Sequence, residues 1–301
     1  MTLPSRHLPL RTTPPAHDPP AHDNVGGRGE VPGCGRQAVS GQEHLPPPDA
    51  GLSPNAAASL AAGRAQAGAQ AGVLSLRGLR AAYGQSEVLH GLDLEVAPGE
   101  IVAVLGRNGM GKTTLMKSLI GLVPASGGEV LLGGRSLNAL RTHQRVAAGL
   151  AYVPQGRMIF PAMTVQENIE TGLFVRGATA VPPHLYELFP VLLEMRSRRG
   201  GNLSGGQQQQ LAIARALATG PSVLLLDEPT EGIQPSIILE LARTLRRIRD
   251  ETGLSIVVSE QVLSFALSVA DRVLVIEGGR IVHQSPRTQI DETKIARFLA
   301  V

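Results

Sequence analysis

Directly after the apolar stretch from Ile101 to Leu105, the chain reads GRNGMGKTT over residues 106–114. This segment fits the phosphate-binding pattern G-x-x-x-x-G-K-[ST] at every fixed position. Such a loop belongs between a strand and a helix, here expected over Lys112 to Leu122, so it predicts a strand–loop–helix unit. The alternative, a glycine-rich turn without a ligand, is disfavoured because both flanking elements are in place.

The residue types in this loop suit a polyphosphate. We expect Gly106, Gly109 and Gly111 to take positive φ angles, so that the backbone wraps the phosphates without a Cβ clash. Lys112 would reach the β and γ oxygens, the Thr113 hydroxyl would ligate Mg²⁺, and the helix dipole would add positive potential. The predicted nucleotide contacts in the loop are Gly106, Arg107, Asn108, Gly109, Met110, Gly111, Lys112, Thr113 and Thr114.

Composition divides the 301 residues near position 72. Residues 1–72 hold 11 of the 22 prolines, 10 glycines and no aromatic residue, so little apolar surface offsets the entropy of ordering, and we predict a disordered tail. Its four histidines are irregularly spaced, which favours a solvated tail over a metal tract. No methionine lies between Met1 and Met110, and the ordered pattern begins at Val73, so we also expect a misassigned start near Val73.

The sequence also disfavours several classes of protein. No apolar segment is long enough for a secretory signal or a membrane span. The single cysteine, Cys34, excludes an intrachain disulfide and suits a reducing cytosol. Residues 73–301 carry 23 basic and 20 acidic side chains, which is too even a balance to argue for nucleic acid binding.

From Val73 onward, short apolar runs alternate with helical patterns, which predicts an α/β layer structure with a largely parallel central sheet. Its expected strands are 101–105, 223–226, 255–258 and 273–276, and an earlier set, 73–76, 92–96 and 129–132, is expected to form an antiparallel β edge. Between Gln155 and Leu217 apolar residues recur at helical spacing, which predicts an inserted helical subdomain over about residues 156–217. A later helix, Ser236 to Arg249, carries an arginine cluster that we interpret as a solvated face.

Two carboxylates end one of the buried strands, in the run VLLLDEP from Val223 to Pro229. Asp227 fits the residue that holds Mg²⁺ in phosphate-loop enzymes, and Glu228 could polarise the water that attacks a γ-phosphate. Either acid alone could be an ordinary strand-end cap. The phosphate loop upstream favours the catalytic interpretation for the pair.

A third motif, LSGGQQQQLAIARAL over residues 203–217, provides a second anion-binding device. Ser204, Gly205 and Gly206, followed by Gln207, offer a hydroxyl and amides at the start of a helix. Because Lys112 already marks one phosphate site, the second device is best explained by the nucleotide of a partner chain. A merely capped helix after a glycine-rich turn is the weaker alternative.

With these three motifs in order, residues 73–301 resemble one complete ATP-binding-cassette (ABC) ATPase. The resemblance implies a P-loop core with an antiparallel β edge and a helical subdomain, using ATP and Mg²⁺. It also implies that Tyr83 stacks on adenine and that Gln155 in YVPQG contacts Mg²⁺ or the attacking water. On its own, Tyr83 would be assigned to core packing.

The chain departs from the general family pattern at two positions. Gln261, in VVSEQ, stands where most cassettes have a switch histidine, and Gln234 stands for the aspartate of the usual S-A-L-D segment. A glutamine amide can still donate a hydrogen bond to a γ-phosphate, but it cannot become a cation. We therefore expect turnover to depend mainly on Glu228.

Several local segments resemble the ATPases of the branched-chain amino acid and urea uptake group. The segment TEGIQPSII, Thr230 to Ile238, is most like the urea transporter ATPase subunit. The resemblance implies a second ABC ATPase subunit, two transmembrane permease subunits and a periplasmic substrate-binding protein, at the cytoplasmic face of the inner membrane. Ile159, Phe160, Met163 and Val165 could meet a permease helix, or be buried beneath the subdomain. Two rivals stay open: an importer of branched-chain amino acids or another amide, and a soluble cassette acting on nucleic acid or ribosomes.

Overall fold

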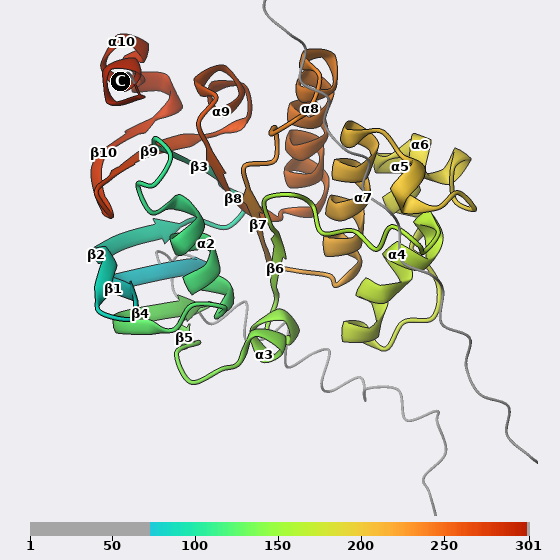
Figure 1. Ribbon diagram of the computed structural model, residues 1–301, viewed down its shortest axis with the longest axis horizontal. Coiled ribbons are helices and arrows are strands. Elements are labelled where there is room, and N and C mark those ends of the chain that lie inside the picture. The colour runs from blue at the N-terminus through green and yellow to red at the C-terminus, as the bar shows by residue number, and fades with distance from the viewer. Residues whose placement is uncertain (1–72, 300–301) are drawn as a thin grey trace, which may run out of the picture. The chain divides into compact units, whose positions relative to one another are not determined.

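The computed structural model describes residues 73–299 (Figure 1). The predictions for residues 1–72, including the tail, Cys34 and the misassigned start, lie outside this part. Within it, a mainly parallel sheet carries helices on one face, and on the other face further helical residues together with a second, antiparallel sheet, which confirms the predicted α/β class.

The central sheet has six strands in the order β10-β9-β3-β8-β7-β6. The strands β9, β3, β8, β7 and β6 run parallel, and β10 pairs antiparallel with β9 at one edge. Their bounds are β3 Ile101–Leu105, β6 Leu150–Val153, β7 Val223–Asp227, β8 Ser255–Glu260, β9 Arg272–Glu277 and β10 Arg280–Pro286. The four strands predicted for this sheet are confirmed, whereas β6 and β10 were missed because both are short or half-exposed.

The remaining strands form an antiparallel sheet in the order β2-β1-β4-β5. Their bounds are β1 Leu74–Tyr83, β2 Ser86–Val96, β4 Ala125–Leu132 and β5 Arg135–Ser136. The predicted antiparallel set is thus present, but it is a sheet of its own rather than an edge of the central one. Its β1 and β2 are also about twice as long as the sequence indicated, because the two strands pair up to the turn between Tyr83 and Ser86.

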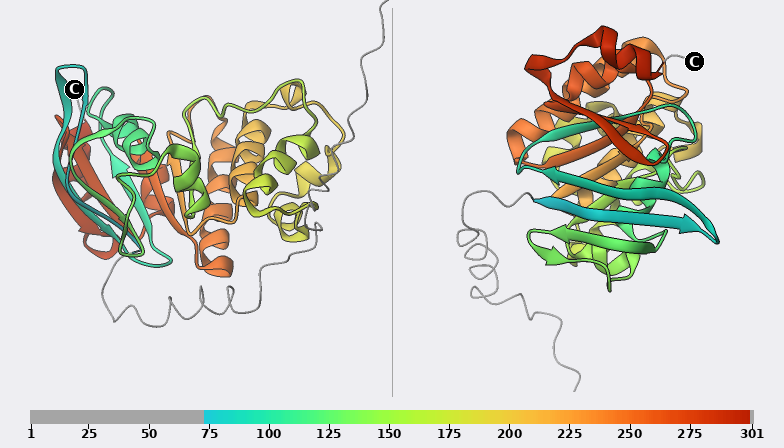
Figure 2. Two further views of the ribbon diagram at one scale, coloured as in Figure 1. Left: turned by 90° about the horizontal axis from the view of Figure 1, so that it is seen from below. Right: turned by 90° about the vertical axis from the view of Figure 1, so that its left-hand side faces the viewer.

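The helices lie between and after these strands in the chain. Their bounds are α2 Lys112–Ile120, α3 Thr142–Ala147, α4 Val165–Leu173, α5 Pro183–Leu188, α6 Pro190–Glu194, α7 Gly205–Ala218, α8 Pro235–Thr252, α9 Leu263–Val269 and α10 Glu292–Leu299, with 3₁₀ turns at Phe174–Arg176, Gly200–Asn202 and Arg287–Gln289. Helices α4 to α7 lie together beside the sheet, in the stretch expected to be helical (Figures 1 and 2). Within residues 73–299, no helix combines the length and apolarity needed to cross a bilayer.

Alternate residues of the central strands face two separate cores. In β3, Ile101, Ala103 and Leu105 pack with the helices α4 to α9, while Val102 and Val104 pack with α2 and the antiparallel sheet. Strands buried on both faces read as continuous apolar runs, which is why this sheet was recognisable in the sequence. Their carboxyl ends, in contrast, carry polar residues that lead into loops.

The arginine cluster of α8 is not simply a solvated face, contrary to the prediction. Arg249 pairs with Asp271 at 2.7 Å and with Asp250 at 2.6 Å. Arg247 pairs with Glu251 at 2.6 Å and also donates to a backbone carbonyl of α5. The cluster therefore links α8 to the start of β9 and to the α4–α7 region.

Candidate nucleotide site

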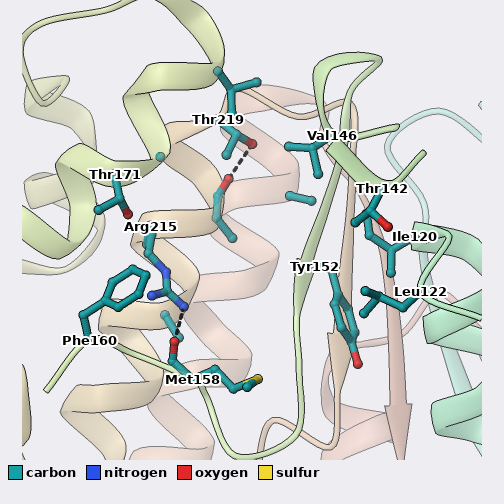
Figure 3. A pocket seen from close by; sticks show the side chains of 15 residues that line it. Ile120, Leu122, Thr142, Val146, Tyr152, Met158, Phe160, Thr171, Arg215 and Thr219 are labelled. Carbon is teal, nitrogen blue, oxygen red and sulfur yellow. Dashed lines mark hydrogen bonds between the residues drawn. The ribbon is translucent and has the colours of Figure 1, made fainter. Parts of the chain in front are cut away.

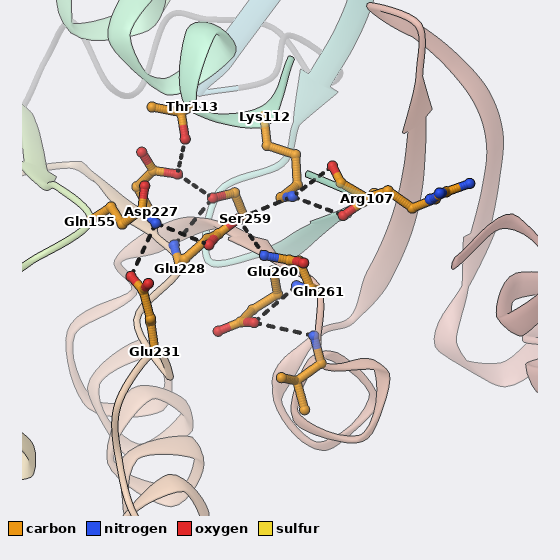
Figure 4. A network of polar contacts seen from close by, with 12 residues as sticks. Arg107, Lys112, Thr113, Gln155, Asp227, Glu228, Glu231, Ser259, Glu260 and Gln261 are labelled. Carbon is orange, nitrogen blue, oxygen red and sulfur yellow. Dashed lines mark hydrogen bonds and ion pairs between the residues drawn. The ribbon is translucent and has the colours of Figure 1, made fainter. Parts of the chain in front are cut away.

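Four loops converge where neighbouring parallel strands end (Figure 4). The phosphate loop follows β3, the segment beginning with Glu228 follows β7, Gln261 follows β8, and Gln155 follows β6 shortly after its last residue. Open α/β sheets bind ligands at this edge because the loops that leave parallel strands meet there. A cavity of about 210 Å³ opens at this point, and its lining residues are Val88, Asn108, Gly109, Gly111, Lys112, Thr113, Thr114, Gln155 and Glu228.

The glycines of the phosphate loop serve two different purposes. Gly109 and Gly111 have φ angles of 79° and 104°, as expected for a loop that turns its amides inward. Gly106 does not have a positive φ, so that part of the prediction is wrong. A Cβ there would lie 2.6 Å from the Ile276 carbonyl oxygen of β9, and close packing is what requires glycine at this position.

Lys112 is the first residue of α2, and only 4% of it is exposed. Its Nζ donates to the carbonyl oxygens of Gly106 at 2.8 Å and Arg107 at 3.1 Å, and it lies 3.1 Å from Oε1 of Glu228. A buried ammonium needs such partners because its desolvation is costly. Phosphate oxygens can replace them, and the cavity beside Lys112 provides the space.

Thr113 and Asp227 are brought together as the sequence predicted. Thr113 Oγ1 donates to Asp227 Oδ1 at 3.2 Å, and Asp227 also accepts from Ser259 at 2.6 Å and from the Tyr152 hydroxyl at 3.1 Å. Burial, and then the Asp227 carboxylate, raise the pKa of Tyr152 far above its ordinary value, so that Tyr152 remains a neutral donor. The hydroxyl and carboxylate oxygens are hard donors suited to Mg²⁺, which takes few protein ligands beside substrate phosphates.

Glu228 is directed away from Asp227 by its backbone. Its φ is 47°, a left-handed conformation that is uncommon outside glycine, and Ser259 fixes its amide through a backbone oxygen at 3.0 Å and Oγ at 3.2 Å. The carboxylate then lies between three donors. It contacts Lys112 at 3.1 Å, Gln261 Nε2 at 3.0 Å and Gln155 Nε2 at 3.4 Å.

Gln261 is placed at the site by a carboxylate that the sequence analysis missed. Glu260, 2% exposed, accepts from the Gln261 and Val262 amides with Oε2. Its Oε1 accepts from the amide and hydroxyl of Thr230, at 3.1 and 2.7 Å. Burial raises the pKa of Glu260, while these hydrogen bonds lower it. Glu260 thus joins the loop after β8 to the loop after β7.

The second anion-binding motif folds as a helix start but does not line this cavity. Ser204 is the N-cap of α7, where its Oγ accepts from the Gln207 amide at 3.3 Å, and Gln207 Oε1 accepts from the Ser204 amide at 3.0 Å. The amides of Gly205 and Gly206 belong to the first helical turn, whose N–H groups lack intrahelical partners. Tyr83, at the end of β1, is 51% exposed and does not line the cavity either.

Four side chains of this network were not singled out in the sequence: Tyr152, Glu231, Ser259 and Glu260. Ser259 and Glu260 did leave a signal, because polar residues end an otherwise apolar strand. Tyr152 and Glu231 left none, since their partners Asp227 and Gln155 are 75 and 76 residues away.

Comparisons with known proteins agree with this geometry. A family model described as ABC transporter matches residues 89–231. The high-affinity branched-chain amino acid transport ATP-binding protein BraG of Pseudomonas aeruginosa is 40% identical over 203 residues, covering 66% of this chain and 87% of BraG. The probable branched-chain amino acid transport ATP-binding protein LivF of Archaeoglobus fulgidus is 33% identical over 217 residues, covering 71% and 92%.

Solved structures show the same fold. A dimeric post-hydrolysis state of the ATP-binding cassette MJ0796, bound to ADP and Pi, matches with a TM-score of 0.65 and 24% identity, covering 71% of this chain and 98% of that one. The phosphate loop, the paired acids after β7 and the likeness to BraG and LivF over most of their lengths agree with one another. The chain belongs to the ATP-binding subunits of ABC transporters, which are ATPases.

Proposed function

We propose that this chain hydrolyses ATP at the carboxyl edge of its central sheet to drive an importer, with urea as the transported substrate. The observation that carries the proposal is the position of Glu228, whose carboxylate lies 3.1 Å from the phosphate-loop ammonium of Lys112. A base within reach of a phosphate-binding cation suits γ-phosphoryl transfer to water.

In the proposed reaction, Lys112 and the loop amides bind the phosphates, and Glu228 accepts a proton from the water that attacks the γ-phosphorus. The bond to the β–γ bridging oxygen breaks, giving ADP and inorganic phosphate. Thr113 and Asp227 would hold Mg²⁺, which neutralises phosphate charge when it is bound. Gln261 donates to Glu228 at 3.0 Å and so keeps that carboxylate oriented.

The helix start at Ser204 supports a nucleotide shared between two chains. Its amides lie outside the phosphate-loop cavity, so they are available to a nucleotide held by a partner ATPase, whether a second copy or a different subunit. A γ-phosphate bound by both chains would favour the closed dimer, and its loss would favour opening. Tyr83 is exposed enough for its ring to stack on the adenine, and Gln155 lines the cavity with Thr113, where it would contact Mg²⁺ or the attacking water.

A groove with α2, α3 and β6 on one side and α4 and α7 on the other supports a permease partner (Figure 3). It has a volume of about 450 Å³ and a mostly apolar lining that includes Leu122, Tyr152, Met158 and Phe160. Leu122 and Met158 are 56% and 69% exposed. We infer that an amphipathic cytoplasmic helix of the permease docks here, which would place this chain at the inner face of the membrane.

Only part of the apolar group named from sequence belongs to this surface. Phe160 is 46% exposed and lines the groove, where the Arg215 guanidinium lies 5.1 Å from its ring centroid. Val165, in contrast, is fully buried at the start of α4 and cannot contact a partner, and Ile159 packs against the helical core. Leu122 and Met158 were missed because the groove as a whole is assembled from segments spread between Ile120 and Thr219.

The substrate is proposed from a sequence resemblance rather than from a binding site in this chain. The segment TEGIQPSII resembles urea transporter ATPase subunits, whereas the names of BraG and LivF support the alternative of branched-chain amino acid import. In either case a periplasmic binding protein and the permease would select the substrate. The even charge of residues 73–301 gives no support to the nucleic-acid rival.

Replacing Lys112 with Ala should weaken ATP binding about 100-fold, the scale of losing two charge-assisted hydrogen bonds to phosphate. Titration of the full chain with a fluorescent ATP analogue measures the affinity. Lys117→Ala, five residues further along, is the control and should bind normally. Unchanged affinity in Lys112→Ala would count against the phosphate-loop assignment.

Replacing Glu228 with Gln should lower steady-state hydrolysis by about 10²-fold or more, because the amide cannot accept the proton, while ATP binding persists. Phosphate release and analogue titration measure the two quantities separately. Glu251→Gln, an exposed change on α8, should leave both unchanged. Near-normal turnover in Glu228→Gln would remove Glu228 from its role as base.

Replacing Leu122 with Asp should remove the permease from the complex, because it places a charge on an apolar docking surface. Purification of the tagged chain with its membrane subunits measures retention, and hydrolysis by the isolated chain should stay within about twofold because Leu122 lies outside the nucleotide site. Leu193→Asp, exposed on α6 outside the groove, is the matched control. Full retention in Leu122→Asp would show that the permease binds elsewhere.

Cells that lack this chain should lose energy-dependent uptake of urea, because the proposed shared nucleotide sites need this chain's phosphate loop and helix start. Uptake of labelled urea and labelled leucine, with and without the restored gene, distinguishes the two substrates. A return of urea uptake supports the proposal. A return of leucine uptake alone would favour the amino acid importer instead.

A further inference from the structure

Gln155 and Glu231 join the loop after β6 to the loop after β7, close to the catalytic base (Figure 4). Gln155 Nε2 donates to Glu231 Oε2 at 3.0 Å and makes a longer contact of 3.4 Å to Glu228 Oε2. Both partners of this nitrogen are carboxylates, and ionised carboxylates only accept hydrogen bonds. The nitrogen end of the Gln155 amide must therefore face the two acids.

The opposite end of the amide has no such constraint. Over residues 73–299, the structure gives Gln155 Oε1 no hydrogen-bond donor, and Gln155 lines the cavity that Thr113 and Lys112 also line. An amide oxygen is a suitable ligand for Mg²⁺ or acceptor for a water proton, whereas an amide nitrogen is neither. The orientation of the amide thus decides whether Gln155 can take part in the chemistry.

A second contact holds the same two loops at a fixed separation. Arg157 donates to the backbone oxygen of Glu231 at 2.8 Å, and its own φ of 66° is a left-handed conformation that its surroundings must maintain. Arg215 of α7 in turn donates to the Met158 oxygen at 2.8 Å. Because these bonds use backbone oxygens, the Glu231 side chain can be removed without losing them.

We propose that Glu231 is a positioning residue for Gln155: it binds Nε2 and so presents Oε1 to the divalent cation and the attacking water. This inference rests on the proposed function, since it assigns a task within the same site. Glu228 alone would hold the amide only weakly, through the 3.4 Å contact, and Glu228 is already engaged by Lys112 and Gln261. With Glu231 present, Gln155 binds Glu231, while Glu228 binds Lys112 and Gln261.

The direct test is a double-mutant cycle of Gln155→Ala and Glu231→Ala on cation binding. Mn²⁺ is titrated into the full chain with a non-hydrolysable ATP analogue, and bound Mn²⁺ is measured by electron paramagnetic resonance. We expect Glu231→Ala to raise the Mn²⁺ dissociation constant about three- to tenfold, the scale of one lost hydrogen bond. In the Gln155→Ala background, Glu231→Ala should have no further effect.

Two more variants distinguish positioning from a general loss of structure. Glu231→Gln offers Nε2 an amide oxygen and should recover most of the cation affinity. Glu170→Ala removes a similar amide–carboxylate bond, from Gln166 at 2.7 Å on α4, and should leave Mn²⁺ binding unchanged. Because Glu231 and Gln155 are both exposed, the midpoint of thermal unfolding should shift little in either single variant.

Either of two results would overturn the inference without affecting the proposed function. One is an unchanged Mn²⁺ affinity in Glu231→Ala. The other is a double variant whose fold-change in Mn²⁺ dissociation constant equals the product of the fold-changes in Gln155→Ala and Glu231→Ala. In both cases Lys112→Ala and Glu228→Gln would still lose nucleotide binding and hydrolysis. Failure of those two variants to show their losses would instead reject the proposed function itself.

Discussion

The buried ammonium of Lys112 is the interaction on which the rest of the site depends. Burial of this charge is tolerated because two loop carbonyls and the Glu228 carboxylate surround it. The same contacts bring Glu228, the proposed base, to the phosphate loop. In the proposed function a triphosphate in the cavity would compete with Glu228 for Lys112, so nucleotide binding would be coupled to release of Glu228.

The backbone at the end of β7 directs the side chains of Asp227 and Glu228 to different partners. The left-handed φ of Glu228 sends its side chain toward Lys112, while Asp227 remains among Thr113, Tyr152 and Ser259. The two adjacent carboxylates therefore contact different partners. The strain is held by Ser259, which binds the Glu228 amide and the Asp227 carboxylate at once.

Sequence reasoning reached the parts of this molecule whose signals are local. The β3 loop, the acids after β7 and the capped start of α7 each lie within one short segment, and buried parallel strands read as continuous apolar runs. Sequence reasoning failed where a residue's role depends on contacts with distant segments of the chain. Gly106 is required by the Ile276 carbonyl of β9, and the groove that Leu122 lines includes residues of α4 and α7, more than 40 positions away.

The geometry of the complex with nucleotide and Mg²⁺ most directly tests the claim that Lys112 exchanges Glu228 for phosphate. A structure of the full chain with Mg²⁺ and a non-hydrolysable ATP analogue should show Lys112 Nζ on β and γ phosphate oxygens, withdrawn from Glu228, with Glu228 facing a water in line with the γ-phosphorus. Lys112 still paired with Glu228 while the nucleotide lies elsewhere would contradict the account.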